Sequence, residues 1–122
     1  MAKILIAEDS ATAAMLLSRA LAPLGHQVTV ARDGAEAEQR IQADHPDLVI
    51  LDIIMPRVNG FQICRAIRSD PHTAETPIII VTAMDREADR YWGLKQGANE
   101  YFIKPVNTET LTAAVTRYLE AD

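Results

Sequence analysis

The sequence contains a single cysteine, Cys64, among its 122 residues. One cysteine cannot form a disulfide within the chain, and it excludes a cysteine-rich zinc site. The scarcity of cysteine fits a protein that works in a reducing compartment. Because free cysteine behaves as a small apolar residue, we expect Cys64 in the core, on a helix.

Basic residues are outnumbered: 12 lysines and arginines face 17 aspartates and glutamates, for a formal net charge of -5. Without a basic stripe to release counterions, nonspecific binding to nucleic acid or to an anionic membrane is not expected. No apolar stretch approaches the roughly 20 residues that a membrane span needs. Residues 1–3 lead directly into a predicted strand rather than into a signal peptide. We therefore expect a cytoplasmic protein whose partners are other proteins.

Four short apolar runs, rich in β-branched residues, are each followed directly by polar residues. The runs are residues 4–7, 48–51, 78–81 and 101–103, and the residues that follow them are Glu8, Asp9, Asp52, Thr82 and Lys104. Such runs are typical of strands buried on both faces of a parallel sheet, and ligands bind beyond the carboxyl ends of such strands. The pattern therefore predicts that three carboxylates, a hydroxyl and an ammonium group converge at one edge.

Segments with helical periodicity lie between the runs, together with a further alternating strand at 27–31. The predicted helices are one from the N-cap Ser10 to Gly25, one over 35–43, one with the inner stripe Phe61, Cys64 and Ile67, one over about 86–96 before Gly97, and one after Asn107 and Thr108 with Leu111, Val115 and Leu119 inward. Right-handed crossovers then give an α/β fold, a doubly wound five-stranded parallel sheet with helices on both faces. The flavodoxin-like strand order 2-1-3-4-5 suits this size, and the absence of linkers or repeats predicts one domain over 1–122.

This topology places Glu8 and Asp9 beside Asp52. Three carboxylates so close repel one another, and a hard divalent cation relieves the repulsion. Oxygen ligands without histidine suit Mg²⁺, which commonly shares its shell with a phosphate. A carboxylate next to Mg²⁺ can act as a nucleophile toward phosphorus, while Thr82 and Lys104 can bind phosphoryl oxygens. The residues therefore predict phosphoryl transfer to an aspartate.

Four fragments in this order and spacing resemble the receiver domain of CheY-like response regulators over essentially the whole chain. They are Glu8-Asp9-Ser10, Asp52-Ile53-Ile54-Met55-Pro56 with Gly60, Thr82-Ala83, and Lys104-Pro105. The resemblance implies that Asp52 accepts a phosphoryl group from a phosphohistidine on a sensor histidine kinase. It also implies that Glu8, Asp9, Asp52 and the backbone carbonyl of Ile54 hold Mg²⁺.

The same resemblance implies a switch and an output surface. Thr82 and Tyr101 correspond to the switch pair, and the Lys104-Pro105 bond is expected to be cis. The output surface of the family lies on the fourth helix, the fifth strand and the fifth helix. Two positions depart from the family pattern: Glu8 stands where aspartate is more common, and Ile54 has no polar side chain to orient an attacking water. The lifetime of the phosphoryl group is therefore left open.

Two other functions compete with this interpretation. A phosphatase of the haloacid dehalogenase type also uses a strand-end aspartate with Mg²⁺, but it needs a second acid two residues later, where this chain has Ile54. We therefore expect only self-phosphorylation and autodephosphorylation rather than an enzyme acting on other substrates. A degenerate, unphosphorylated scaffold is the other alternative, and the intact set of Glu8, Asp9, Asp52, Thr82 and Lys104 argues against it.

Because the sequence ends just after the fifth predicted helix, we expect a monomeric stand-alone regulator that signals by docking to a downstream protein; a receiver cut from a longer regulator is the alternative. The stretch 85–101 is similar to the twitching-motility (PilH-like) subgroup, whose members act in type IV pilus and chemotaxis-like signalling. Trp92 lies one position from the stripe of Tyr91, Leu94 and Ala98. It is either the edge of the core or an exposed anchor for a partner.

Overall fold

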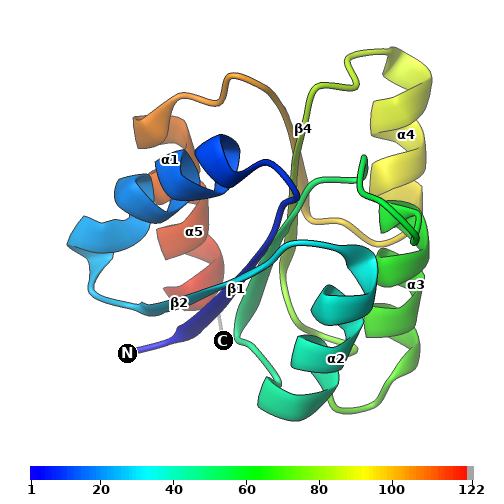
Figure 1. Ribbon diagram of the computed structural model, residues 1–122, viewed down its shortest axis with the longest axis horizontal. Coiled ribbons are helices and arrows are strands. Elements are labelled where there is room, and N and C mark those ends of the chain that lie inside the picture. The colour runs from blue at the N-terminus through cyan, green and yellow to red at the C-terminus, as the bar shows by residue number, and fades with distance from the viewer. Residues whose placement is uncertain (121–122) are drawn as a thin grey trace.

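A computed structural model describes residues 1–120, which form a five-stranded parallel sheet between two layers of helices (Figure 1). The elements in chain order are β1 (Lys3–Ala7), α1 (Ala11–Leu21), the 3-10 turn η1 (Ala22–Leu24), β2 (Gln27–Ala31), α2 (Gly34–Asp44), β3 (Leu48–Leu51), α3 (Gly60–Ser69), β4 (Ile78–Thr82), α4 (Glu87–Lys95), β5 (Glu100–Ile103) and α5 (Thr108–Glu120). The predicted domain span of 1–122 ends two residues beyond the described part. Within residues 1–120, no helix is both long and apolar enough to cross a bilayer.

The strand order is β2-β1-β3-β4-β5, which confirms the predicted flavodoxin-like arrangement. In the register of the sheet, Ala7 of β1 lies opposite both Ala31 of β2 and Leu51 of β3. On the other side, Thr82 of β4 lies opposite Ile103 of β5. The residues that directly follow β1, β2, β3 and β5 therefore emerge at one edge of the sheet.

Two apolar clusters hold the helices against the sheet. One cluster joins α1 and α5 to one face through residues such as Leu17, Leu21, Leu111 and Val115. The other joins α2, α3 and the segment after α4 to the opposite face, with Cys64 fully buried among them. The two layers are visible on either side of the sheet in Figure 1. Strands β1, β3 and β4 thus lie in the interior, so the groups at their carboxyl ends have a rigid support.

One predicted strand is less buried than expected. Strand β5 is not buried on both faces, because Ile103 is 42% exposed and Phe102 is only half-buried. It forms the edge of the sheet, with β4 as its one strand neighbour, so less of its surface is covered. On α3, Cys64 and Ile67 are buried as predicted, and Phe61 is half-buried against the same cluster. Ile63 is also buried, so the inner face of α3 is wider than the predicted stripe.

Helix α4 turns its large side chains outward. Tyr91, Trp92 and Leu94 are 58%, 51% and 41% exposed, so the stripe that includes Tyr91 and Leu94 is not the inner face. Gly93 faces the sheet instead, where a β-carbon would lie 2.8 Å from Cδ2 of Tyr101. Because the Tyr101 ring occupies this space, only a residue without a side chain lets α4 come so close. Trp92 is therefore a surface residue, packed edge-on against Tyr91.

Candidate functional site

Three carboxylates meet where β1 and β3 end. Glu8, Asp9 and Asp52 each present an oxygen, and these oxygens lie within 4.8 Å of one another. Backbone hydrogen bonds extend the sheet to the first and third of them: Glu8 N donates to Ala31 O at 2.9 Å, and Asp52 N donates to Ala7 O at 3.0 Å. The sheet therefore fixes the backbone from which Glu8 and Asp52 extend.

Lys104 extends from β5 to this cluster. Its Nζ donates to Oε1 of Glu8 at 2.6 Å and to Oδ2 of Asp52 at 2.8 Å. The Lys104 backbone N–H donates to the carbonyl of Thr82 at 2.8 Å, and the following peptide bond to Pro105 is cis. The lysine is 27% exposed, whereas both carboxylates are almost completely buried. One ammonium group thus bridges two buried carboxylates that directly follow two different strands, β1 and β3.

Burial and charge shift the ionisation of this pair. Burial raises the pKa of the Glu8 carboxyl above its ordinary value, although Lys104 and the backbone N–H of Ser10 oppose that change. Burial alone would lower the pKa of Lys104, but its bonds to Asp52 and Glu8 outweigh burial and raise it. Lys104 therefore remains an ammonium group, yet one positive charge cannot balance three carboxylates. The site has room in its charge balance for a further cation.

The donor atoms fit Mg²⁺. Glu8, Asp9 and Asp52 offer hard carboxylate oxygens, and their cluster contains neither histidine nor cysteine. The backbone of Ile54 lies beside them, because its N–H donates to Oδ1 of Asp52 at 2.9 Å. These three carboxylates and the carbonyl of Ile54 are the groups that would hold the ion. Asp9 is exposed, so the cluster is open to solvent on one side.

Thr82 and Tyr101 are linked through the backbone of Met84. Thr82 is fully buried, and its hydroxyl accepts a long hydrogen bond of 3.4 Å from the N–H of Met84. The Tyr101 ring points inward and is 1% exposed, and its hydroxyl donates to the carbonyl of Met84 at 2.8 Å. Arg90 of α4 donates to the carbonyl of Tyr101 at 3.2 Å. The loop between β4 and α4 therefore contacts both residues of the predicted switch pair.

Sequence reasoning missed two contributors. The guanidinium of Arg32 donates to the carbonyl of Asp9 at 2.8 and 3.2 Å and so supports the loop that carries this acid. Arg32 directly follows β2, so the rule that singled out the other strand-end residues could have found it. The second contributor, Met84, bonds to Thr82 and Tyr101 through its backbone atoms, and a pattern of side chains cannot predict such a role.

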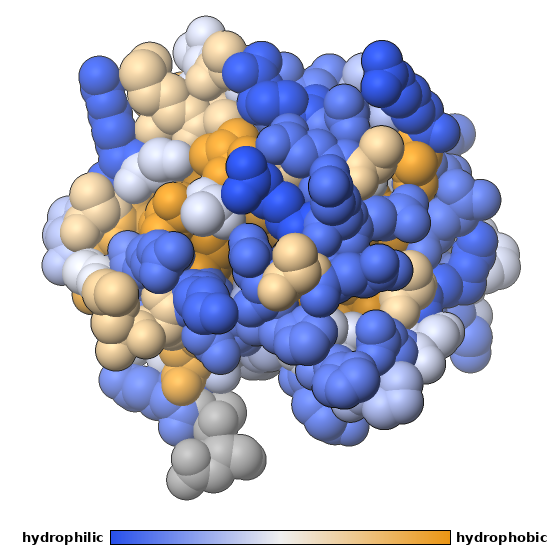
Figure 2. Space-filling model, turned by 60° about the horizontal axis from the view of Figure 1, so that its bottom comes forward, coloured by the Kyte–Doolittle hydropathy of each residue, from blue (hydrophilic) through white to orange (hydrophobic). Residues whose placement is uncertain are grey.

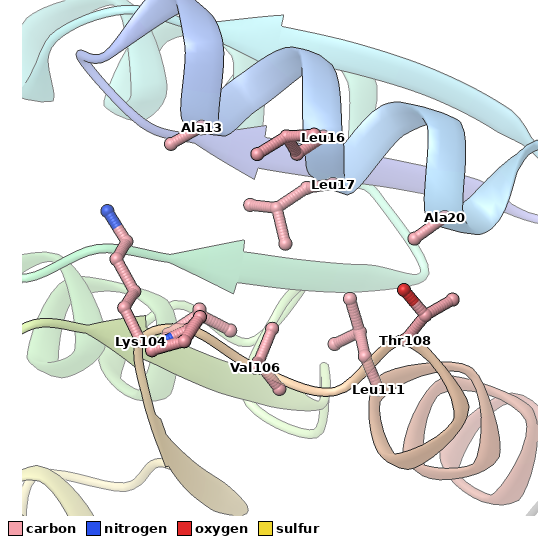
Figure 3. Close-up of a pocket in the computed structure, with 10 residues that line it drawn as sticks. Ala13, Leu16, Leu17, Ala20, Lys104, Val106, Thr108 and Leu111 are labelled. Carbon is pink, nitrogen blue, oxygen red and sulfur yellow. The ribbon is translucent and has the colours of Figure 1, made fainter.

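An apolar groove of about 480 Å³ opens beside Lys104. Leu16 and Leu17 of α1 face Val106 and Leu111 across it (Figure 3). Figure 2 views the molecule with the bottom of Figure 1 turned forward. On this face, apolar surface lies mainly on the side of α1 and α5, whereas hydrophilic residues cover the side of α2 and α3. The groove has no carboxylate in its lining, so it adjoins the charged cluster without belonging to it.

The sequence model of one protein family, the response regulator receiver domain, matches residues 4–116. The chain belongs to this family. Receiver domains accept phosphoryl groups from histidine kinases and generally bind Mg²⁺, and this receiver has the acidic cluster that such binding requires.

Relatives of this receiver differ in length. It is 43% identical over 119 residues to the protein PilH of Pseudomonas aeruginosa, covering 98% of each chain. It is also 37% identical over 117 residues to a probable transcriptional regulator ycf27 of Cyanophora paradoxa. That match includes 96% of this chain but only 48% of the relative, which is about twice as long. The predicted similarity to PilH is therefore confirmed.

Solved structures confirm the CheY-like fold. A putative response regulator from Chloroflexus aurantiacus superposes with a TM-score of 0.93 at 32% identity, covering 98% of both chains. The chemotaxis protein CheY4 of Vibrio cholerae has a TM-score of 0.88 at 33% identity, covering 97% of this receiver and 98% of CheY4. The fold of this receiver is therefore shared along almost the entire chain.

Proposed function

We propose that this receiver is a phosphorylation switch in which Asp52 accepts a phosphoryl group from a sensor histidine kinase in the presence of Mg²⁺. The observation that carries the proposal is the meeting of Glu8, Asp9 and Asp52 within 4.8 Å, with Lys104 bonded to two of them. An isolated loop-capping aspartate would need neither the other two acids nor the lysine. The combination instead suits a carboxylate nucleophile in a site built for phosphate.

In the proposed transfer, an oxygen of Asp52 attacks the phosphorus of the phosphohistidine. The phosphorus–nitrogen bond breaks, and the imidazole leaves with the bonding electrons and takes up a proton. Lys104, already 2.8 Å from Asp52, would follow the new phosphoryl group as its counterion. When bound, Mg²⁺ would neutralise charge on the phosphoryl oxygens. The buried hydroxyl of Thr82 would supply a further hydrogen bond to them.

The proposed output is a change on the face formed by α4, β5 and α5. A hydrogen bond from Thr82 to the phosphoryl group would weaken its contact with Met84, whose carbonyl also holds the Tyr101 hydroxyl. The exposed side chains of Trp92 on α4 and Ile103 on β5 offer apolar contacts to a downstream protein. Trp92 would serve as the anchor of that interaction.

We propose no enzymatic action on other substrates, only self-phosphorylation and autodephosphorylation. The side chain of Ile54 stands where a phosphatase of the haloacid dehalogenase type needs its second acid, and it cannot move a proton. The similarity to PilH supports a role in twitching motility or a related chemotaxis-like pathway. We further propose a monomeric regulator of the same extent as PilH, which the chain matches over 98% of both sequences. It would work in the cytoplasm, where a free cysteine such as Cys64 stays reduced.

Acetyl phosphate with Mg²⁺, followed by mass spectrometry of the intact protein and its peptides, tests this proposal. One acid-labile phosphoryl group is expected on Asp52, and Asp52→Asn should remove it. Asp85→Asn is the matched control, because Asp85 is an exposed acid in the loop that follows β4. Its phosphorylation should equal that of the wild type. Phosphoryl uptake at another residue, or undiminished uptake by Asp52→Asn, would contradict the assignment.

A further inference from the structure

The loop between β3 and α3, residues 53–59, carries the carbonyl that would bind Mg²⁺ and contains a tight turn. Arg57 has a φ of 76°, and the N–H of Val58 donates to the carbonyl of Pro56 at 2.9 Å. A positive φ of this size with a bond between residues two apart is the pattern of the γ-turn that is rare and strained. Such a turn persists only where its surroundings hold it in place.

The N-terminus of α2 supplies that support. Gly34, its first residue, is buried directly against Val58. The neighbouring Asp33 caps α2 by accepting from the N–H of Glu36 at 2.8 Å, and its other oxygen lies 3.8 Å from Nη1 of Arg57. The central residue of the turn, Arg57, and the donor of its hydrogen bond, Val58, therefore both lie against the N-terminus of α2.

The contact requires the absence of a side chain at Gly34. A β-carbon there would lie 2.3 Å from Cβ of Val58 and 3.3 Å from its Cα, so the conflict involves backbone as well as side chain. Helix α2 is fixed by its cap and by the core residues Ala37 and Ile41. The loop, strained and half-exposed, is the part that would yield. Because Val58 and Ile54 belong to the same short loop, a displacement of Val58 would also shift the backbone of Ile54.

We propose that Gly34 is a positioning residue of the metal and phosphoryl site: its lack of a side chain lets the 53–59 loop rest on α2 and so sets the carbonyl of Ile54 beside Asp52. The inference rests on the proposed binding of Mg²⁺ at this site. It assigns part of the site's geometry to a residue that touches neither metal nor phosphate. Mutation of a residue that orients a metal ligand indirectly commonly lowers metal affinity by about 10- to 100-fold.

The test compares Gly34→Ala with Gly25→Ala. Gly25 has a φ of 78° with no atom within 4 Å of a β-carbon, and it precedes β2 at the opposite edge of the sheet, so its substitution strains the backbone without touching the loop. Amide hydrogen exchange of Ile54 and Val58 without metal reports how firmly the loop is held. The dependence of the melting temperature on Mg²⁺ concentration reports the affinity.

In Gly34→Ala, exchange of both amides should accelerate and Mg²⁺ affinity should fall about tenfold, whereas Gly25→Ala should match the wild type in both. Gly34→Ala combined with Val58→Gly removes the closest clash and should recover most of the affinity. Equal exchange and affinity in Gly34→Ala and Gly25→Ala would overturn the inference, as would faster exchange with unchanged affinity. A wild-type protein whose melting ignores Mg²⁺ would instead contradict the proposed function, while the exchange comparison would still decide whether Gly34 seats the loop.

Discussion

The ammonium group of Lys104 lies 2.6 Å from Oε1 of Glu8, although the two residues come from opposite ends of the chain. The same group lies 2.8 Å from Asp52, so it is the fixed cation between two buried carboxylates. The extra methylene of a glutamate, compared with an aspartate, provides the reach for this contact. Glu8 thus has a second role beside its predicted one as a metal ligand, because it helps to hold Lys104 at the nucleophile.

Removal of that ammonium should destabilise the protein most when no metal is present. Lys104→Met leaves Glu8 and Asp52 facing each other without a counterion. We expect the free energy of unfolding in EDTA to fall by about 2 kcal/mol, below the roughly 3–5 kcal/mol of a fully buried pair because Lys104 is 27% exposed. Urea unfolding with and without Mg²⁺ measures the free energy of unfolding. Mg²⁺ should increase this free energy more in the variant than in the wild type.

Lys95→Met is the control for this prediction, because Lys95 is an exposed lysine on α4. Its loss should change the free energy of unfolding by no more than about 0.5 kcal/mol. Similar losses in the two variants would show that the bridge between Glu8 and Asp52 contributes no specific stability.

Asp9→Ala should abolish stabilisation by Mg²⁺ while leaving the metal-free fold almost unchanged. Asp9 is the exposed member of the acidic cluster, so its side chain contributes little to packing. In the wild type, a concentration of Mg²⁺ 100 times its dissociation constant stabilises the fold by about 2.7 kcal/mol through mass action. Melting temperatures measured over a Mg²⁺ series test this. An undiminished shift in Asp9→Ala would remove Asp9 from the metal site.

The position of the site could be predicted because the carboxyl ends of parallel strands all lie on the same side of the sheet. Once the order 2-1-3-4-5 is assumed, the strand-end positions of Glu8, Asp52 and Lys104 follow from sequence alone. The contacts among them do not follow, because the reach of Lys104 depends on side-chain rotamers. The same limit applies to Met84, which acts through its backbone. The roles of these residues in phosphoryl transfer remain predictions.

Helix faces were harder to predict than strand ends. On α4, the apolar residues Tyr91 and Leu94 suggested an inner stripe, but the space beneath the helix is already filled by the Tyr101 ring, so Gly93 takes the inner position. Apolar periodicity records which residues avoid water on average and does not record the size of the space available. A helix that presents apolar residues to a partner breaks the pattern in the same way.

Tyr101→Phe should change the response to alkali. Burial raises the pKa of the Tyr101 hydroxyl from 10.0 to about 12. Between these values the folded protein retains a proton that the unfolded chain has lost, so this group's contribution to stability is lost as the pH rises from 10 toward 12. Stability should therefore fall less steeply over this range in Tyr101→Phe, since the contribution of Lys104 is common to both proteins.

At neutral pH, the same variant should lose about 1 kcal/mol, because the hydrogen bond to the Met84 carbonyl is absent. Urea unfolding at a series of pH values gives both results, and a tyrosinate absorbance titration of the wild type gives the pKa directly. Parallel pH profiles for the two proteins would show that the Tyr101 ring does not stay inward in solution.

Ile54 should govern how long the phosphoryl group survives. Its side chain is 51% exposed and follows Asp52 by two residues, with its backbone N–H bonded to that carboxylate at 2.9 Å. An apolar side chain there cannot orient a water molecule for attack on phosphorus. Ile54→Asn introduces an amide that can. We expect loss of the phosphoryl group to accelerate by about tenfold, less than the roughly 10²- to 10⁴-fold of a well-positioned acid or base, because an exposed amide holds water loosely.

Ile54→Leu is the matched control, since it keeps the apolar character and nearly the same volume and should retain the wild-type rate. Both variants preserve the backbone N–H that bonds to Asp52, so initial uptake of phosphate should be similar in all three proteins. The decay of protein labelled with radioactive phosphate, followed after removal of the donor, measures the lifetime. Equal decay in Ile54→Asn and Ile54→Leu would mean that another part of the site controls the access of water, and the exposed side near Asp9 would be the next place to examine.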